Sequence, residues 1–287
     1  MRLALGTAQW GAGYGITNTR GRLDDDAIAA IMATALALGI TAVDTHRTTD
    51  PAQGYGSAQR RLRPWSADVE VTTKVFGGDR ADLPAIDQLR ASLDELGLQR
   101  VRGCLVHDWY ALDEAARHRV AGELEQARAL GLVDEIGISA YDVADAAAAL
   151  RCFPALGAVQ VPASVIDQRF SADGIMVALR HAGTRVQVRS VFLQGLLLDP
   201  NSSSPLASHP DVERFHDWCR ERAVPPLVAC LAHVHALPWA DEVVVGVTGA
   251  DELAQIGEAW ATSMPDIDWG ALASSDAALL DPRRWER

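Results

Sequence analysis

The sequence predicts an α/β fold of the (β/α)8 type, a TIM barrel built from a single domain. Eight short apolar runs alternate with longer amphipathic segments, which is the element order of such a barrel. The runs are continuously apolar rather than alternating in polarity, as expected for parallel strands that are buried on both faces. We expect one domain over residues 1–287, and an open, doubly wound sheet is the alternative.

The expected strands are short and rich in apolar or β-branched residues. They lie at residues 3–5, 41–44, 69–73, 102–106, 135–138, 158–161, 185–188 and 242–245. The amphipathic segments predict helices at residues 24–38, 82–96, 113–130, 142–151, 173–181, 211–222 and 251–260. Several of these helices begin with aspartate, which caps free backbone N–H groups, and several end at glycine.

Composition and charge restrict the classes of function. The net charge of −12 disfavours nucleic acid and anionic membranes, so we expect a small-molecule partner. The four cysteines form no CxxC pair and have no metal-ligand spacing, which predicts free thiols in a reducing cytoplasm and no metal. The apolar run at residues 1–10 is too short for a signal peptide or a membrane span.

Ionisable residues follow three consecutive expected strands. Asp44, Lys74 and His107 come at the ends of the second, third and fourth strands. In both candidate folds the carboxyl ends of the strands carry the active site, so we expect these three side chains to lie close together. A tyrosine, Tyr55, is near the first of them. Tyrosine is a weak acid with a pKa of about 10, and a nearby lysine would favour its phenolate.

Nine segments, taken in order, resemble the aldo-keto reductase family. Four of them resemble its catalytic segments: AVDT (42–45), GYGSAQ (54–59), VTTK (71–74) and CLVHD (104–108). Five others resemble its remaining strand ends: LGTAQWG (5–11), GISAYD (137–142), AVQVPAS (158–164), VRSVFLQGLL (188–197) and VVVGVTGADEL (243–253). The resemblance covers almost the whole chain and implies a TIM-barrel oxidoreductase that reduces an aldehyde or ketone, or oxidises an alcohol, with a nicotinamide cofactor.

The resemblance implies a catalytic role for four residues. Tyr55 would donate the proton and Lys74 would favour its phenolate, while Asp44 holds the lysine and His107 orients the carbonyl. The separation 55 − 44 = 11 is longer than the family usually has. The alternative is therefore a non-catalytic or cofactor-binding barrel in which the insertion between Asp44 and Tyr55 has displaced the tyrosine. Tyr14 is the second candidate for the proton donor.

The resemblance also implies an extended cofactor, NADP(H) or NAD(H), across the barrel mouth. Two of its expected contacts would bind the carboxamide, one would stack on the nicotinamide, four would flank the pyrophosphate and the rest would lie by the adenosine. In that order they are Ser139, Gln160, Arg189, Ser190, Phe192, Leu193, Gln194, Gly246, Thr248 and Glu252. A Rossmann reading of GAGYGI (11–16) is the weaker alternative, because no expected helix opens directly after it.

The segment after the last strand favours tolerance of NAD(H). Residues 246–258 contain no Lys or Arg, whereas Asp251, Glu252 and Glu258 are acidic. A carboxylate accepts a hydrogen bond from a ribose 2′-hydroxyl but repels the 2′-phosphate of NADPH, which arginine binds well. The alternative is that these acids only cap a helix and that an arginine from elsewhere in the fold supplies the positive charge.

Five residues near the expected strand ends are candidates for substrate binding. They combine aromatic and polar side chains, which suits a sugar-like, polyol-derived or aromatic aldehyde. They are Trp10, Tyr14, His46, Arg47 and Trp109. His233 and His235 do not predict a metal pair, because residues two apart on a helix face away from one another.

Overall fold

The computed structural model describes residues 1–48, 56–262 and 267–285. Its eight parallel strands pair in chain order, and β1 pairs with β8, which closes the barrel and excludes the open sheet. Each strand lies within two residues of its expected bounds. The strands are β1 (Arg2–Gly6), β2 (Ala42–Asp44), β3 (Glu70–Val75), β4 (Val101–Val106), β5 (Val133–Ser139), β6 (Ala158–Pro162), β7 (Arg185–Arg189) and β8 (Glu242–Gly246).

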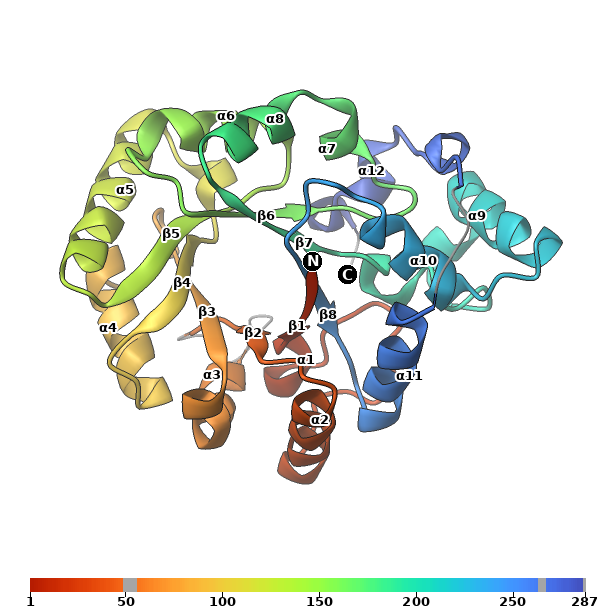
Figure 1. Ribbon diagram of the computed structural model, residues 1–287, viewed down its shortest axis with the longest axis horizontal. Helices are drawn as coiled ribbons and strands as arrows, with labels where there is room; N and C mark the ends of the chain where they lie inside the picture. Colours follow the sequence, from red (N-terminus) through yellow and green to blue (C-terminus); the bar gives the residue numbers. More distant parts are fainter. Residues whose placement is uncertain (49–55, 263–266, 286–287) are drawn as a thin grey trace.

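Helices form a ring outside the barrel (Figure 1). The longer ones are α2 (Asp25–Ala37), α4 (Ala85–Leu96), α5 (Glu114–Ala129), α6 (Val143–Cys152), α8 (Ile175–His181), α9 (Pro210–Glu221), α10 (Pro226–His235) and α11 (Ala250–Trp260). Short ones are α1 (Ala8–Gly11), α3 (Ala58–Leu62), α7 (Arg169–Ala172) and α12 (Ala277–Leu280). The 3-10 helices are η1 (Arg63–Asp68), η2 (Trp109–Ala111), η3 (Leu193–Gly195), η4 (Pro205–Ser208), η5 (Gly270–Leu272) and η6 (Pro282–Arg284).

Aspartate caps begin three of the expected helices. The carboxylates of Asp24, Asp113 and Asp142 each accept a hydrogen bond from the backbone N–H three residues later. These bonds satisfy donors that a helix start leaves open, so the local sequence places the helix starts. None of the helices in the described ranges is both long and apolar enough to cross a membrane.

Charged residues close the barrel at the end where its strands begin. The ion pairs join residues in the first three positions of six strands: Arg2, Glu70, Arg102, Glu135, Arg185 and Glu242. Glu242 is central to this ring, with its carboxylate 2.8 Å from Arg2 Nε and 3.1 Å from Arg185 Nη1. The ring leaves the opposite end, where the strands finish, as the end that can hold a site.

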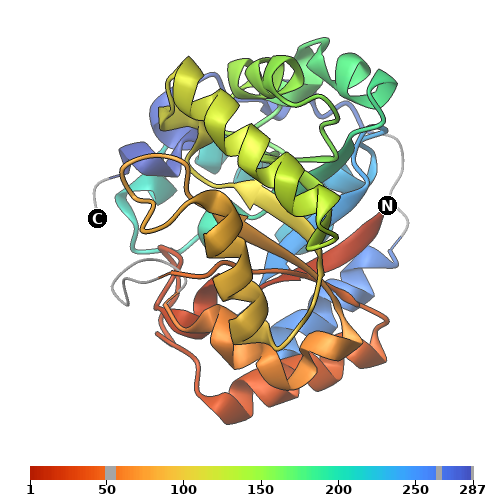
Figure 2. The same cartoon turned by 90° about the vertical axis from the view of Figure 1, so that its left-hand side faces the viewer.

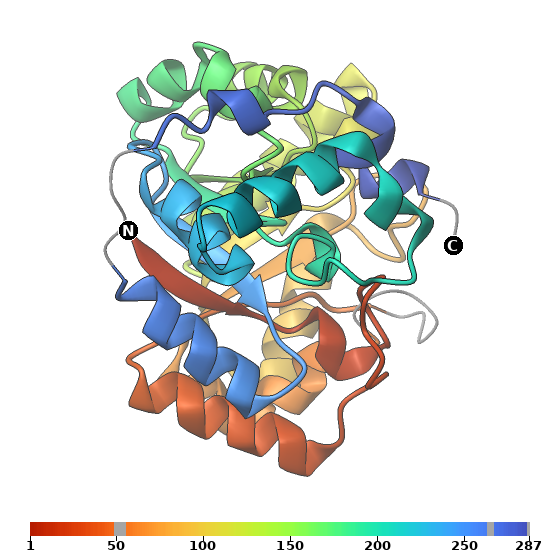
Figure 3. The same ribbon diagram turned by 90° about the vertical axis from the view of Figure 1, so that its right-hand side faces the viewer.

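The C-terminal segment lies at that opposite end. Figures 2 and 3 show α12 on the far side of the barrel from the start of β1. Arg283, on η6, stacks over Tyr110 and Tyr141, with its guanidinium carbon 4.2 and 4.0 Å from the two ring centroids. These tyrosines follow β4 and β5, so the C-terminal segment packs against the loops around the barrel mouth.

Candidate active site

Lys74 and Asp44 form a buried ion pair at the mouth of the barrel. Lys74 Nζ donates to both carboxylate oxygens of Asp44 at 2.6 Å and to the carbonyl oxygen of Thr45 at 3.3 Å. The two side chains are only 1% and 3% exposed. Burial lowers the pKa of Lys74, and the Asp44 charge opposes that effect. The pair therefore keeps the Lys74 ammonium and its carboxylate partner in a place from which water is excluded.

A chain of polar side chains runs from this pair to the floor of the barrel. Gln160 Nε2 donates to Asp44 Oδ1 at 2.9 Å and to Gln187 Oε1 at 3.3 Å. Gln187 in turn donates to Glu242, which belongs to the floor ring, the ring of ion pairs at the end where the strands begin. Gln187 was not among the expected site residues. Its only signal in the sequence is a polar side chain at the centre of an otherwise apolar strand.

Two histidines lie together beside Lys74. His46 Nδ1 donates to the Lys74 carbonyl oxygen at 3.1 Å, and the His46 ring centroid is 5.1 Å from that of His107. Phe76 packs against both rings, at 4.9 and 5.5 Å between centroids. Burial, reinforced by the charge of Lys74, lowers the pKa of His46 to about 3. Burial also holds the pKa of His107 well below its usual value, so both rings are neutral at pH 7.

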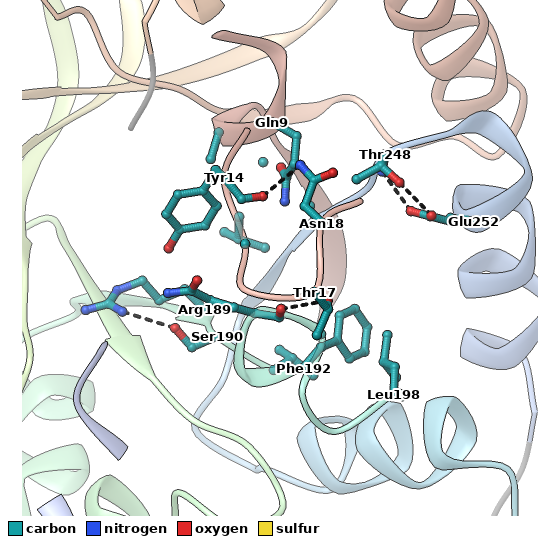
Figure 4. Close-up of a pocket in the computed structure, with 18 of the residues that line it drawn as sticks. Gln9, Tyr14, Thr17, Asn18, Arg189, Ser190, Phe192, Leu198, Thr248 and Glu252 are labelled. Carbon is teal, nitrogen blue, oxygen red and sulfur yellow. Dashed lines mark hydrogen bonds between the residues drawn. The ribbon is translucent and has the colours of Figure 1, made fainter. Parts of the chain in front are cut away.

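A cavity of about 410 Å³ opens beside Asp44, between the loops that follow β1, β7 and β8. Eight of the ten expected cofactor residues line it: Gln160, Arg189, Ser190, Phe192, Gln194, Gly246, Thr248 and Glu252. Ser139 and Leu193 are 1% exposed and lie behind its wall. Figure 4 shows Tyr14 and Arg189 on one side of this cavity and Thr248 and Glu252 on the other. The cavity therefore reaches from Asp44 to the loop after β8.

The loop after β7 has a strained backbone where it borders the cavity. Ser190, Leu193 and Gln194 have φ angles of 64°, 47° and 55°. Non-glycine residues in this left-handed region cost about 1–3 kcal/mol each and gather at ligand sites. The Gln194 carbonyl accepts a hydrogen bond from Thr17 Oγ1 at 3.0 Å, and a Cβ on Gly195 would overlap that hydroxyl. The loops after β1 and β7 thus meet too closely at position 195 for a residue larger than glycine.

Two buried polar atoms of the cavity walls fit a polar ligand. Gln9 Oε1 and Arg189 Nε have no hydrogen-bond partner within the described part of the chain. Buried polar atoms are nearly always hydrogen-bonded, so these two atoms are suited to a ligand with amide or phosphate groups. The Arg189 guanidinium carbon also lies 4.4 Å from the ring centroid of Tyr141, and its Nη2 donates to the Ala140 carbonyl at 2.9 Å. The residues present therefore fit a nicotinamide dinucleotide.

The expected substrate residues are not all at the mouth. Tyr14 lines the cavity and His46 lies beside His107, whereas Arg47 is 3.4 Å from Asp82 in an ion pair. Trp10 and Trp109 line no part of the cavity, because both are fully buried core residues. Trp109 Nε1 donates instead to the Asp145 carbonyl at 3.1 Å. An aromatic residue next to a strand end looks the same in sequence whether it faces the core or a ligand.

Tyr55 lies outside the described residues, so the structure places three of the four expected catalytic residues. The glycine segment 11–16 belongs to a closed barrel rather than to a doubly wound sheet, which overturns the Rossmann alternative. His233 is buried in α10, with its ring centroid 5.5 Å from that of Trp269. Within the described ranges, no group of His, Cys, Asp and Glu side chains could hold a metal ion.

Comparison with known proteins identifies relatives of one kind. A model of the Aldo/keto reductase family matches residues 2–277. Methylglyoxal reductase DkgB of Escherichia coli O157:H7 is 30% identical over 122 residues, which are 42% of this chain and 46% of that protein. An aldo-keto reductase of Mycobacterium marinum is 32% identical over 119 residues, 42% of each chain. This chain thus matches less than half the length of these curated relatives.

The fold is also found among solved structures. A glycerol dehydrogenase of Gluconobacter oxydans superposes with a TM-score of 0.70, covering 94% of this chain and 89% of its own. The two sequences are 19% identical, so this likeness supports the barrel and not a shared substrate.

Proposed function

The chain belongs to the aldo/keto reductase family, and we propose that it is an NAD(P)-dependent carbonyl reductase or alcohol dehydrogenase. The observation that carries this proposal is the buried pair of Lys74 and Asp44 beside His107. Burying two charges costs several kcal/mol per ion before their attraction is counted. A barrel that only held a ligand would have no need of that arrangement, whereas carbonyl reduction requires a cation beside the proton donor.

The residues of the chain prepare the site for negative charge on a carbonyl oxygen. A bound nicotinamide would supply the hydride. We assign the proton to Tyr55 on the basis of the sequence, and Lys74 is the cation that favours its phenolate. His107 is neutral because burial lowers its pKa, so it keeps one N–H to donate to the same oxygen. Asp44 keeps Lys74 in place with two hydrogen bonds of 2.6 Å.

We assign the cavity to the cofactor, NADP(H) or NAD(H). The nicotinamide belongs at the end near Asp44 and Gln160, because the reacting carbon must lie beside Lys74. The adenosine then belongs at the other end, near Thr248 and Glu252. Arg189 Nε and Gln9 Oε1 are buried polar atoms that could form hydrogen bonds with the cofactor. We expect the substrate, a small carbonyl compound, to bind beside His107 and His46, which lie together next to Lys74.

Paired tyrosine variants test this function. Tyr55→Phe deletes only the proposed proton donor, so we expect kcat to fall by a factor of about 10² to 10⁴ while the fluorescence titration with NADPH is unchanged. Tyr14→Phe is the matched control, since Tyr14 also lines the cavity, and we expect it to keep most of its activity. The carbonyl panel includes sugar-like and aromatic aldehydes. Methylglyoxal is added because one relative is named as its reductase.

Two outcomes would change the assignment. Full activity in Tyr55→Phe together with lost activity in Tyr14→Phe would move the proton donor to Tyr14. Cofactor binding without turnover of any compound would favour the second candidate function, a non-catalytic cofactor-binding barrel. The observation that favours this second function is the separation of 55 − 44 = 11 residues between the aspartate and the tyrosine.

A further inference from the structure

The loop between β1 and α2 spans the cavity and reaches the loop after β8. Asn18 organises its turn: Nδ2 donates to the carbonyl oxygens of Tyr14 and Gly21, both at 3.1 Å, and Oδ1 accepts from the backbone N–H of Arg20 at 2.9 Å. Thr17 joins the same loop to Gln194 at 3.0 Å. Figure 4 shows Thr17 and Asn18 between the two sides of the cavity. The backbone of Arg20 is therefore held at the adenosine end.

The Arg20 side chain extends from this turn onto the loop after β8. Its Nη1 donates to the Thr248 carbonyl at 3.3 Å, and its Nη2 is 3.5 Å from Asp251 Oδ2. Both members of this ion pair are more than half exposed, at 52% and 62%. Exposed pairs of this kind contribute little to stability, so the guanidinium can exchange Asp251 for a stronger anion at small cost.

Gly249 leaves room for the guanidinium. A Cβ at this position would overlap both Arg20 Nη1 and Asp251 Oδ1, and the backbone φ of −163° is one that any residue adopts. The glycine is thus explained by the close approach of the Arg20–Asp251 ion pair and not by its backbone conformation. This contact supports a built position for the arginine at the edge of the cavity.

Arg20 supplies the positive charge at the adenosine end of the cavity. Among the described residues that line the cavity, the cations are Arg20 and Arg189, and Arg189 lies at the nicotinamide end. The loop after β8 contributes acids instead. Of these, Glu252 is turned toward its own loop, because its two oxygens accept hydrogen bonds from Thr248 N at 2.7 Å and Thr248 Oγ1 at 2.6 Å.

We propose that Arg20 recognises the adenosine 2′-phosphate of NADPH and so determines the cofactor specificity of this chain. The proposal rests on the proposed function, which assigns the adenosine to this end of the cavity. A guanidinium offers two parallel N–H donors that match phosphate oxygens, whereas the 2′-hydroxyl of NADH gives it no charge to pair with. NADPH is then the tighter cofactor, which is the reverse of the preference that residues 246–258 suggest by themselves.

Fluorescence titration of four variants with NADPH and NADH tests the proposal. Arg20→Met should raise the Kd for NADPH at least about tenfold, equivalent to roughly 1.4 kcal/mol, and leave the Kd for NADH within about twofold. Gly249→Ala keeps the charge but takes its space, so it should weaken NADPH in the same direction. Asp251→Asn removes the competing carboxylate and should tighten NADPH. Arg22→Met is the matched control, because Arg22 is exposed in the same loop and lines no part of the cavity.

A competition experiment separates the phosphates. Adenosine 2′-monophosphate should displace NADPH from the unaltered protein and lose most of that ability against Arg20→Met, whereas adenosine 5′-monophosphate should compete equally with both. If Arg20→Met loses affinity for NADPH and NADH equally, or for neither, the assignment of Arg20 is overturned and the proposed function still stands. Failure of the unaltered protein to bind either cofactor would overturn the proposed function, and the assignment of Arg20 with it.

Discussion

Removing one partner of the Lys74–Asp44 pair should destabilise the protein more than removing both. Both side chains are almost completely buried, at 1% and 3% exposed, and the Lys74 ammonium donates to Asp44 over two contacts of 2.6 Å. Asp44→Asn would remove the carboxylate that pairs with that ammonium. Lys74→Met would remove the ammonium that pairs with the carboxylate, to which Gln160 also donates. The double variant buries no charge in either position.

The magnitude follows from that burial. Breaking a buried ion pair by removing one partner typically costs about 3–5 kcal/mol, whereas replacing both partners is often neutral. The free energy of unfolding of a typical domain is about 5–15 kcal/mol, so either single change would remove about a third to a half of a mid-range value. We expect the double variant to recover most of that loss. It should nevertheless be inactive, because the cation that we propose lies beside the proton donor is gone.

The pH dependence identifies the uncompensated charge as that of Lys74. Burial lowers the pKa of this lysine in the folded state, and Asp44→Asn removes the carboxylate that opposes the effect. The unfolded chain then binds more protons than the folded one between the lowered pKa and about 10.4, so stability rises with pH across that interval. Asp44→Asn should therefore regain stability between pH 7 and pH 10, relative to the double variant, which lacks the lysine.

Urea unfolding of the four proteins at pH 7 and pH 9.5, followed by circular dichroism, measures these differences. The slopes with urea must agree among the variants before their midpoints are compared. Additive losses in the double variant would mean that the two residues do not compensate each other. An Asp44→Asn protein that does not gain on the double variant at pH 9.5 would show that Lys74 is not buried as a charge.

Two further predictions concern residues away from the active site. Glu242→Gln removes the carboxylate that pairs with Arg2 and Arg185 at 2.8 and 3.1 Å. The free energy of unfolding, measured in urea, should therefore fall by about 3 kcal/mol. An equal fall in the control Glu114→Gln, whose side chain is 90% exposed, would contradict a stabilising role of the floor ring. Burial lowers the pKa of His233 from 6.5 to about 4, so its neutral form is favoured in the folded state and the protein loses stability as pH falls through this interval. His233→Leu should lose less between pH 7 and pH 4 than the unaltered protein, by up to about 3 kcal/mol at about 1.4 kcal/mol per unit of pKa, and parallel acid curves would refute this role.

Local sequence patterns determined the barrel and the positions of three expected catalytic residues. Continuous apolar runs predict strands buried on both faces, and aspartate caps such as Asp142 start the helices between them. Asp44, Lys74 and His107 follow three consecutive strands, and the carboxyl ends of parallel strands meet at one end of a barrel. Their proximity needs no knowledge of loop conformation, because the strand ends alone place them.

The tertiary structure decided which side chains from distant segments meet. Arg20 reaches Thr248 across 228 positions of sequence, and Gln160 joins Asp44 across 116. The sequence also could not separate Trp10 and Trp109 in the core from Tyr14 at the cavity. Such contacts depend on the φ and ψ angles of loops and on closure of the barrel, which brings β1 beside β8. Periodicity describes which face of an element is apolar, and closure determines which loops stand opposite one another.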